Sequence, residues 1–73
     1  MNNKHVTKRP DGSWQVKSEG NERASFVTNT QADAIQRGRE LAKRDKSELI
    51  IHGKDGKIRE KNSYGNDPFP PRG

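Results

Sequence analysis

Two Asp-Gly turns constrain the fold of this chain more than any other feature. Proline presets the backbone for the first corner of a turn, and glycine adopts the positive φ that a later corner needs. Asp-Gly between alternating or β-branched segments is also a strong hairpin signal. The sequence therefore predicts two β-hairpins, formed by residues 4–8 and 13–17 around Pro10-Asp11-Gly12 and by residues 48–52 and 57–61 around Asp55-Gly56.

One helix is predicted between the two hairpins. Thr30 and Asp33 form a capping box with aspartate in place of glutamate, and this carboxylate favours the positive end of the helix dipole. Gly38 costs roughly 1 kcal/mol of helix stability relative to alanine, so its expected purpose is close approach of the helix to the sheet. The helix is expected to end near Lys46. Its apolar stripe consists of Ala34, Ile35, Gly38, Leu41 and Ala42.

A third short strand at residues 24–28 completes the predicted order β-β-β-α-β-β. The expected fold class is α+β, a small antiparallel sheet with one helix packed on one face. Residues 1–65 are expected to form a single domain, and residues 66–73 a proline-rich C-terminal tail. A chain of 73 residues has no room for a second domain.

The small apolar content limits what such a fold can do. Only 18 of the 73 residues are hydrophobic, and a small-molecule pocket would need many of them for its lining. Neither an enzyme nor a small-molecule substrate is therefore expected. The longest apolar run, residues 49–51, is far shorter than the roughly 20 residues of a membrane helix. Because the N-terminus lacks the apolar stretch of a secretory signal, we expect a cytoplasmic protein.

Residues that commonly carry chemistry are sparse. The chain has no cysteine, and its two histidines, His5 and His52, have no histidine, cysteine or paired acid at the spacing of metal ligands. Both are expected to be solvated strand residues. No glycine-rich phosphate loop precedes the helix. The sequence therefore predicts no catalytic residue, no metal and no cofactor.

Several motifs in combination are similar to those of one known family. They are residues 30–35 and 39–43 of the helix, residues 48–52 and 55–58 of the second hairpin, Ser63-Tyr64-Gly65-Asn66-Asp67-Pro68, and Trp14-Gln15-Val16 after the first turn. The combination resembles the prokaryotic domain-of-unknown-function 2188 family over about residues 4 to 68. The resemblance implies a compact, single-domain bacterial or phage protein with no established activity. It implies no functional residue.

The charge of the predicted sheet is the main functional clue. Fifteen lysine and arginine residues against ten acids give a formal net charge of +5, which favours nucleic acid or acidic proteins as partners. If the apolar strand positions face the helix, strand alternation places the others on an open face. The helix-facing set is Val6, Trp14, Val16, Leu49, Ile51 and Ile58. The open-face set is His5, Thr7, Arg9, Gln15, Lys17, Ile50, His52, Lys57, Arg59 and Lys61.

This open-face set contains five cations and no acid, and we expect phosphate contacts at Arg9, Lys17, Lys57, Arg59 and Lys61. Two other interpretations stay open. The same residues can form an ordinary solvated surface, or the apolar run 49–51 can take the opposite register and exchange the two faces. The predicted function is a non-enzymatic module that binds nucleic acid, and the alternative is a module that binds an acidic protein partner.

Two of the three aromatic residues outside the predicted strand 24–28 have two interpretations each. Trp14 shares a strand face with Val16, so we expect it in the core rather than on the surface as a platform for nucleobase stacking. Tyr64 is expected to close one edge of the core. Phe69 lies in the proline-rich tail, which is either an extended ligand for a partner groove or a loose or folded-back segment.

Overall fold

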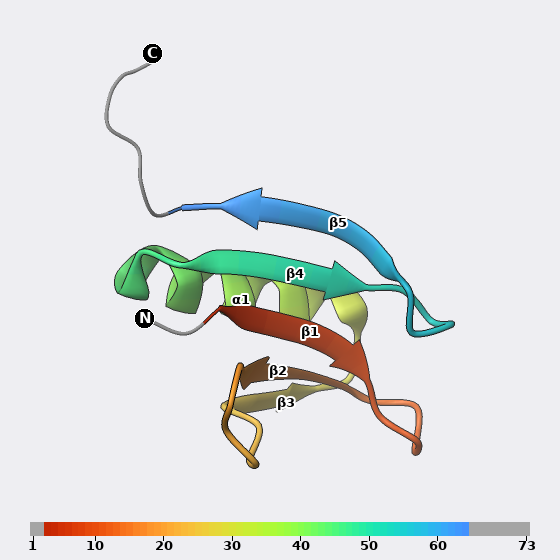
Figure 1. The fold of residues 1–73 in the computed structure, drawn as a ribbon. Coiled ribbons are helices and arrows are strands. Elements are labelled where there is room, and N and C mark those ends of the chain that lie inside the picture. Colours follow the sequence, from red (N-terminus) through yellow and green to blue (C-terminus); the bar gives the residue numbers. More distant parts are fainter. Residues whose placement is uncertain (1–2, 65–73) are drawn as a thin grey trace.

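The computed structural model describes residues 3–64 of the chain. Its five strands form one sheet in the order β3-β2-β1-β4-β5, and α1 covers one face of that sheet (Figure 1). The elements are β1 (Lys4–Lys8), β2 (Trp14–Ser18), β3 (Phe26–Thr28), α1 (Gln31–Asp45), β4 (Glu48–His52) and β5 (Ile58–Ser63). The predicted α+β class, the order of elements and the single helix packed on the sheet are confirmed.

Two predictions reach beyond this description. The tail at residues 66–73, with Phe69, lies outside the described residues, so its role stays a prediction, as does the single domain over residues 1–65. Among the described residues, α1 is too short and too polar to traverse a membrane.

The sheet is mixed, which corrects the expectation of a fully antiparallel one. Three neighbouring pairs run antiparallel, but β1 and β4 pair in parallel, with Val6 opposite Ile51. The reason is the helical crossover that parallel neighbours require. After β3, α1 returns the chain to the end of the sheet where β1 begins, so β4 runs in the direction of β1. Both hairpin turns therefore lie at the same end of the molecule (Figure 1).

The core lies between α1 and the three central strands. The largest fully buried side chains are those of Val6, Val16, Leu49 and Ile51, and Ala34 and Ala42 of α1 complete the layer. Trp14 is only 6% exposed, and Tyr64 packs against the same cluster. The predicted core roles of both aromatic residues are confirmed.

Gly38 sets the distance between α1 and the sheet. A Cβ atom at this position would lie 2.7 Å from Leu49 Cδ1 and 3.3 Å from Val6 Cγ2. Both of those side chains are fully buried, and close packing around them leaves little space into which they could move. The predicted purpose of this glycine, close approach of the helix to the sheet, is confirmed.

Thr30 caps the start of α1 as the sequence predicts, and the helix ends at Asp45, beside the predicted Lys46. The Thr30 side chain accepts a hydrogen bond from the Asp33 N–H at 3.1 Å. At the other end, Lys46 takes the left-handed conformation with φ 54°, and its N–H bonds to the carbonyls of Ala42 and Lys43. The strand before the helix, β3, is shorter than the predicted 24–28 and begins at Phe26.

Lys4 is a buried cation that ties the sheet to the end of α1. Its side chain is 5% exposed, and its Nζ donates to the Asp45 carboxylate at 2.7 Å and to Ser18 Oγ at 3.0 Å. The Arg44 guanidinium, 3.2 Å away, is a second partner of that carboxylate. The hydrogen bonds from Lys4 and Arg44 hold the pKa of Asp45 below its ordinary value.

We expect Gly38→Ala to destabilise the protein. Overpacking a core costs about 1–3 kcal/mol, and alanine recovers about 1 kcal/mol of helix propensity. Because the new methyl group would meet the buried Leu49 at 2.7 Å, we expect a net loss of up to about 2 kcal/mol in the free energy of unfolding, measured in urea. Gln36→Ala, at an exposed helix position, is the control and should change little. In a Gly38→Ala, Leu49→Val double variant the losses should add to less than their sum, and full additivity would contradict the proposed contact.

We expect Asp45→Asn to lower stability at neutral pH, because the neutral amide leaves the buried Lys4 ammonium without its counter-charge. The folded chain keeps Asp45 ionised at pH values where the unfolded chain takes up a proton. This stabilisation is therefore present at neutral pH and is lost as the pH falls through the lowered pKa. Urea unfolding should show a parent–variant difference that shrinks as the pH falls below the ordinary pKa range of aspartate. A difference that stays constant with pH, or one matched by the exposed control Glu40→Gln, would contradict this account.

Candidate nucleic-acid interface

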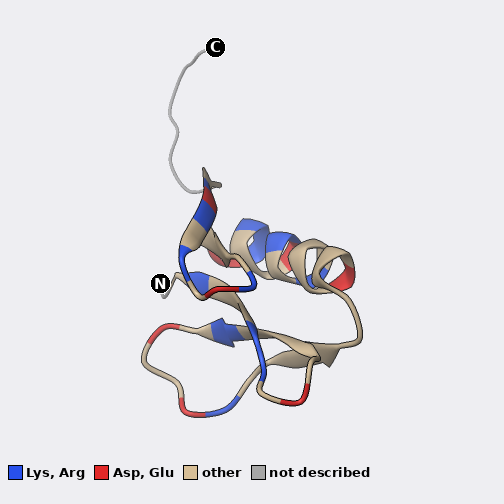
Figure 2. Ribbon diagram, turned by 90° about the vertical axis from the view of Figure 1, so that its right-hand side faces the viewer, with Lys and Arg blue, Asp and Glu red and all other residues tan. Residues whose placement is uncertain are grey.

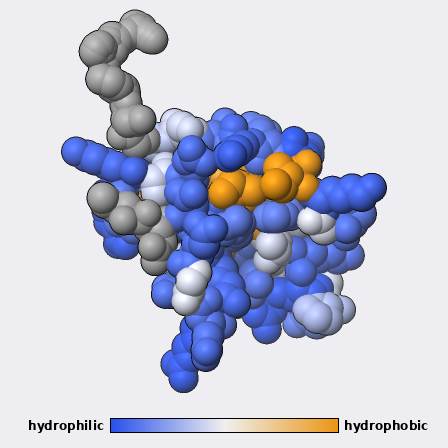
Figure 3. Space-filling model, viewed as in Figure 1, coloured by the Kyte–Doolittle hydropathy of each residue, from blue (hydrophilic) through white to orange (hydrophobic). Residues whose placement is uncertain are grey.

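The sheet face opposite α1, which we term the open face, is only partly the predicted surface. Strand pairing places Lys17, His5, Ile50 and Lys61 in one row across β2, β1, β4 and β5. These four residues lie on the face where they were predicted. Ile50 is only 6% exposed, because its neighbours on this face cover it. Figure 3 views the open face and shows that it is mostly hydrophilic, with a short apolar strip.

A β-bulge between β4 and β5 overturns two predicted positions. Glu60 lies opposite Ile51, whereas Ile58 lies opposite His52, so Arg59 is an extra residue in β5. Ile58 consequently lies on the open side and is 63% exposed, not in the core as predicted. Arg59 is turned away from the open face, and its Nη1 donates to Gln31 Oε1 at the start of α1, 2.9 Å away. Strand alternation fails here because a bulge shifts it by one residue.

Two acids enter the open face, so the prediction of a face without acids is wrong. Glu48 lies two residues before Ile50 in β4 and therefore shares its face. Its Oε1 lies 3.7 Å from Lys61 Nζ. Glu19, which follows β2, has its Oε2 3.8 Å from His5 Nε2. The sequence pattern placed Glu19 in a turn and did not assign Glu48 to a face.

The parallel pairing of β1 and β4 gathers basic residues at one end of the molecule. We define the hairpin end as the two hairpin turns with the strand residues beside them. Its cations are Lys8, Arg9, Lys54, Lys57 and Arg59, and its acids are Asp11 and Asp55. Figure 2 looks onto this end and shows the charged residues of both turns. The N-terminus of α1 lies at the same end, where Gln31 Nε2 donates to the His52 carbonyl at 3.1 Å.

The two acids of the hairpin end are engaged in the turns themselves. Asp11 Oδ1 accepts hydrogen bonds from Ser13 Oγ at 2.6 Å and from the Ser13 N–H at 2.9 Å, which lower the pKa of Asp11. Asp55 Oδ1 accepts from the Lys57 N–H at 3.0 Å. Neither carboxylate forms an ion pair with a lysine or arginine among residues 3–64.

Of the five predicted phosphate contacts, the hairpin end contains Arg9, Lys57 and Arg59. Lys17 and Lys61 lie on the open face in separate strands. Lys61 is paired with Glu48, whereas Arg9 Nη1 donates to the neutral Gln15 Oε1 at 3.0 Å. The structure therefore brings three of the five together and adds Lys8 and Lys54. Strand alternation did not select Lys8 because it shares the helix side of β1 with Val6, and it did not select Lys54 because this residue lies in a turn.

His5 and His52 form a direct pair, contrary to the expectation that neither has a histidine partner. His5 Nδ1 lies 3.1 Å from His52 Nε2, and the ring centroids are 5.3 Å apart. His52 Nδ1 lies 3.2 Å from the Gly56 carbonyl oxygen. Residues 3–64 contain no group of three or more histidine, cysteine or acidic side chains that could hold a metal ion. The sequence did not predict this contact, because no short motif indicates that β1 and β4 are neighbouring strands.

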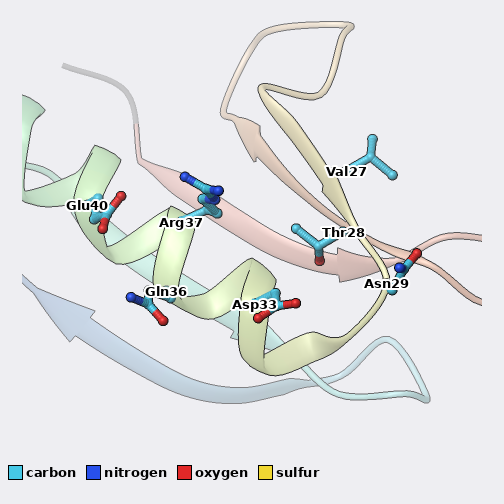
Figure 4. A pocket seen from close by; sticks show the side chains of 7 residues that line it. All are labelled: Val27, Thr28, Asn29, Asp33, Gln36, Arg37 and Glu40. Carbon is cyan, nitrogen blue, oxygen red and sulfur yellow. The ribbon is translucent and has the colours of Figure 1, made fainter.

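A separate hollow lies between β3 and α1 (Figure 4). It has a volume of about 470 Å³, and its helical wall carries Asp33, Gln36, Arg37 and Glu40. The Arg37 guanidinium lies 5.4 Å from the ring centroid of Phe26. Two carboxylates surround one guanidinium in this wall, so its charge does not suit a phosphate ligand.

Comparison with known proteins identifies the family. Residues 4–64 match the family described as "Uncharacterized protein conserved in bacteria (DUF2188)". The chain is 39% identical over 62 residues to "Uncharacterized protein YdaT" of Bacillus subtilis (strain 168), an alignment that covers 85% of this chain and 41% of that relative. The chain thus spans less than half the length of this curated relative. No solved structure matches the chain. The coverage of residues 4–64 shows that the chain belongs to the DUF2188 family.

Proposed function

We propose that this chain is a non-enzymatic binding module that contacts the phosphates of nucleic acid through its hairpin end. The observation that carries the proposal is the state of the cations there. Lys8, Lys54 and Lys57 are exposed, and none forms an ion pair among residues 3–64. Cations without internal counter-charges attract phosphate groups and release bound counterions when they meet them.

The shape of the hairpin end supports contact with an extended polyanion. Two turns from different hairpins stand side by side (Figure 1). Lys8, at the end of β1, is therefore set apart from Lys54 and Lys57, which lie in the turn between β4 and β5. The positive end of the α1 dipole adds to the same field. An extended array of single positive charges suits a phosphate backbone, whereas one compact anion would engage only part of it.

The proposal includes little selectivity for base sequence. Trp14 is buried, so it provides no surface for stacking a base. The cations at the hairpin end are mainly lysines, which bind phosphate as point charges. Such contacts position a ligand without reading its sequence. A nucleic-acid ligand would also place the chain in the cytoplasm, which we include in the proposal.

We expect a Lys8→Gln, Lys54→Gln, Lys57→Gln variant to bind nucleic acid more weakly than the parent. Each phosphate contact contributes about 0.9 to the slope of log K against log salt for duplex DNA, so the slope should fall by about two to three units. The weakening should be similar for unrelated sequences. Fluorescence anisotropy of labelled duplexes, titrated over a series of salt concentrations, measures both effects.

The matched control is Arg23→Gln, Arg39→Gln, Lys43→Gln, which removes three charges away from the hairpin end. It should retain most of the parent's salt slope. If both variants weakened nucleic-acid binding equally, the loss would depend on net charge and not on the hairpin end. Absence of binding by the parent at about 50 mM salt would contradict the nucleic-acid proposal. The alternative, an acidic protein partner, predicts a partner that is still pulled down after nuclease treatment and is lost with the hairpin-end variant.

A further inference from the structure

A small pocket beside the histidine pair is lined mainly by polar and charged side chains. It has a volume of about 190 Å³ and is lined by His5 and Thr7 of β1, by Lys17 of β2, and by Glu19 and Asn21 beyond β2. It opens near the start of β1, whereas the hairpin end lies beyond the C-terminal end of that strand. The Glu19 carboxylate, which lines the pocket, lies 3.8 Å from His5 Nε2. This ring nitrogen is therefore directed toward the pocket.

Hydrogen bonding determines how the two histidines share their protons. The Gly56 carbonyl oxygen can only accept, so His52 Nδ1 carries the hydrogen in their 3.2 Å contact. Neutral His52 then has a bare Nε2, and His5 Nδ1 donates to it over 3.1 Å. His5 Nε2 is therefore the position at which the pair can take up a proton without breaking either contact.

We propose that this pocket binds a phosphate group, held by the protonated His5 Nε2–H and the Lys17 ammonium. Lys17 lies directly opposite His5 in the β1–β2 register and has no ion pair among residues 3–64. Thr7 Oγ1 accepts from Gln15 Nε2 at 3.0 Å, which leaves the Thr7 hydroxyl hydrogen for a ligand oxygen. Two cationic donors and one hydroxyl within a pocket are a suitable set for an oxyanion.

Four further polar groups surround the site and define its charge. Glu19, from the segment after β2, is the acid nearest to His5 Nε2, and its side chain is 61% exposed, so an incoming anion can displace it into water. His52 of β4 is a positioning residue, because it orients the His5 ring without lining the pocket. Across Ile50, the Lys61–Glu48 pair of β5 and β4 is internally neutralised.

Binding in this pocket should strengthen as the pH falls, because only the charged His5 ring carries both a positive charge and the Nε2 hydrogen that the ligand needs as a donor. Inorganic sulfate is the appropriate probe for the pH series, because its own charge is constant over the range. We expect tighter sulfate binding at the acidic end of the pH series than at the alkaline end, measured by NMR titration of the ring nitrogens and backbone amides.

Three variants test the assignment of roles. His5→Gln should remove the pH dependence, and Lys17→Gln should weaken sulfate binding throughout the pH series. Glu19→Gln should tighten binding, since it removes the competing carboxylate. Weaker sulfate binding by Glu19→Gln would overturn the proposal, because the carboxylate would then support the site rather than compete with the anion. A pH dependence retained in His5→Gln would overturn it as well.

The protonation pattern has its own readout. Ring ¹⁵N shifts of the uncharged histidines should show the hydrogen on Nδ1 of both rings. His52→Ala should leave His5 with mixed protonation at its two nitrogens while the amide spectrum of the sheet is retained. A hydrogen on His5 Nε2 in the neutral parent would contradict the pairing on which the site depends.

The inference rests on the proposed function for the source of the phosphate, which is either the end or the backbone of a nucleic acid. Oligonucleotides with and without a 5′-phosphate distinguish the two: His5→Gln weakens only the phosphorylated one if the pocket takes a terminal phosphate, and both equally if it takes a backbone phosphate. The Lys8→Gln, Lys54→Gln, Lys57→Gln variant should still bind sulfate as the parent does. Failure of the hairpin end and failure of the pocket are therefore separate outcomes, and an absence of sulfate binding by the parent would overturn the pocket alone.

Discussion

The contact between α1 and the centre of the sheet at Gly38 is the constraint on which the remaining structure depends. Leu49, Val6 and Val16, from three different strands, all approach the position where a side chain would begin. A chain with 18 hydrophobic residues cannot fill a wide gap between two layers. Close approach at one glycine allows a few valine, leucine and isoleucine side chains to close the interior. The central strands are therefore held together from one side by a single helix.

The helix also determines which residues become neighbours on the opposite face. Because α1 returns the chain along the sheet, β4 must lie parallel to β1, and this one pairing has two consequences. It places both hairpin turns at one end, where Lys8 and Lys54 join the predicted Lys57. It also brings His5 beside His52, 47 residues away in the chain. The candidate surface is thus a product of topology more than of any local motif.

The parts of the fold that follow from local rules could be predicted, and the parts that depend on long-range pairing could not. Asp-Gly turns indicate hairpins, and Thr30 with Asp33 indicates the start of α1, because each signal acts within a few residues. No short sequence motif predicts that β1 pairs with β4. No sequence motif predicts the bulge at Arg59 either, and this bulge moves the Ile58 side chain to the other face of the sheet. The burial of Lys4 could not be predicted either. A lysine at the start of a strand is ordinarily exposed, and the partners that allow its burial, Ser18 and Asp45, are distant in sequence.

The bulge in β5 affects how readily the sheet can pair with strands of other protein molecules. A sheet with free edges can be extended by a strand of another molecule, and regular, flat, apolar edges are the most vulnerable. Here one edge strand, β3, has only three residues, and the other, β5, is interrupted by a bulge and carries Arg59, Glu60 and Lys61 in succession. The same bulge that removes Arg59 from the open face therefore makes β5 a poor template for intermolecular pairing. Protected edges of this kind reduce the chance that a local opening of the sheet leads to aggregation.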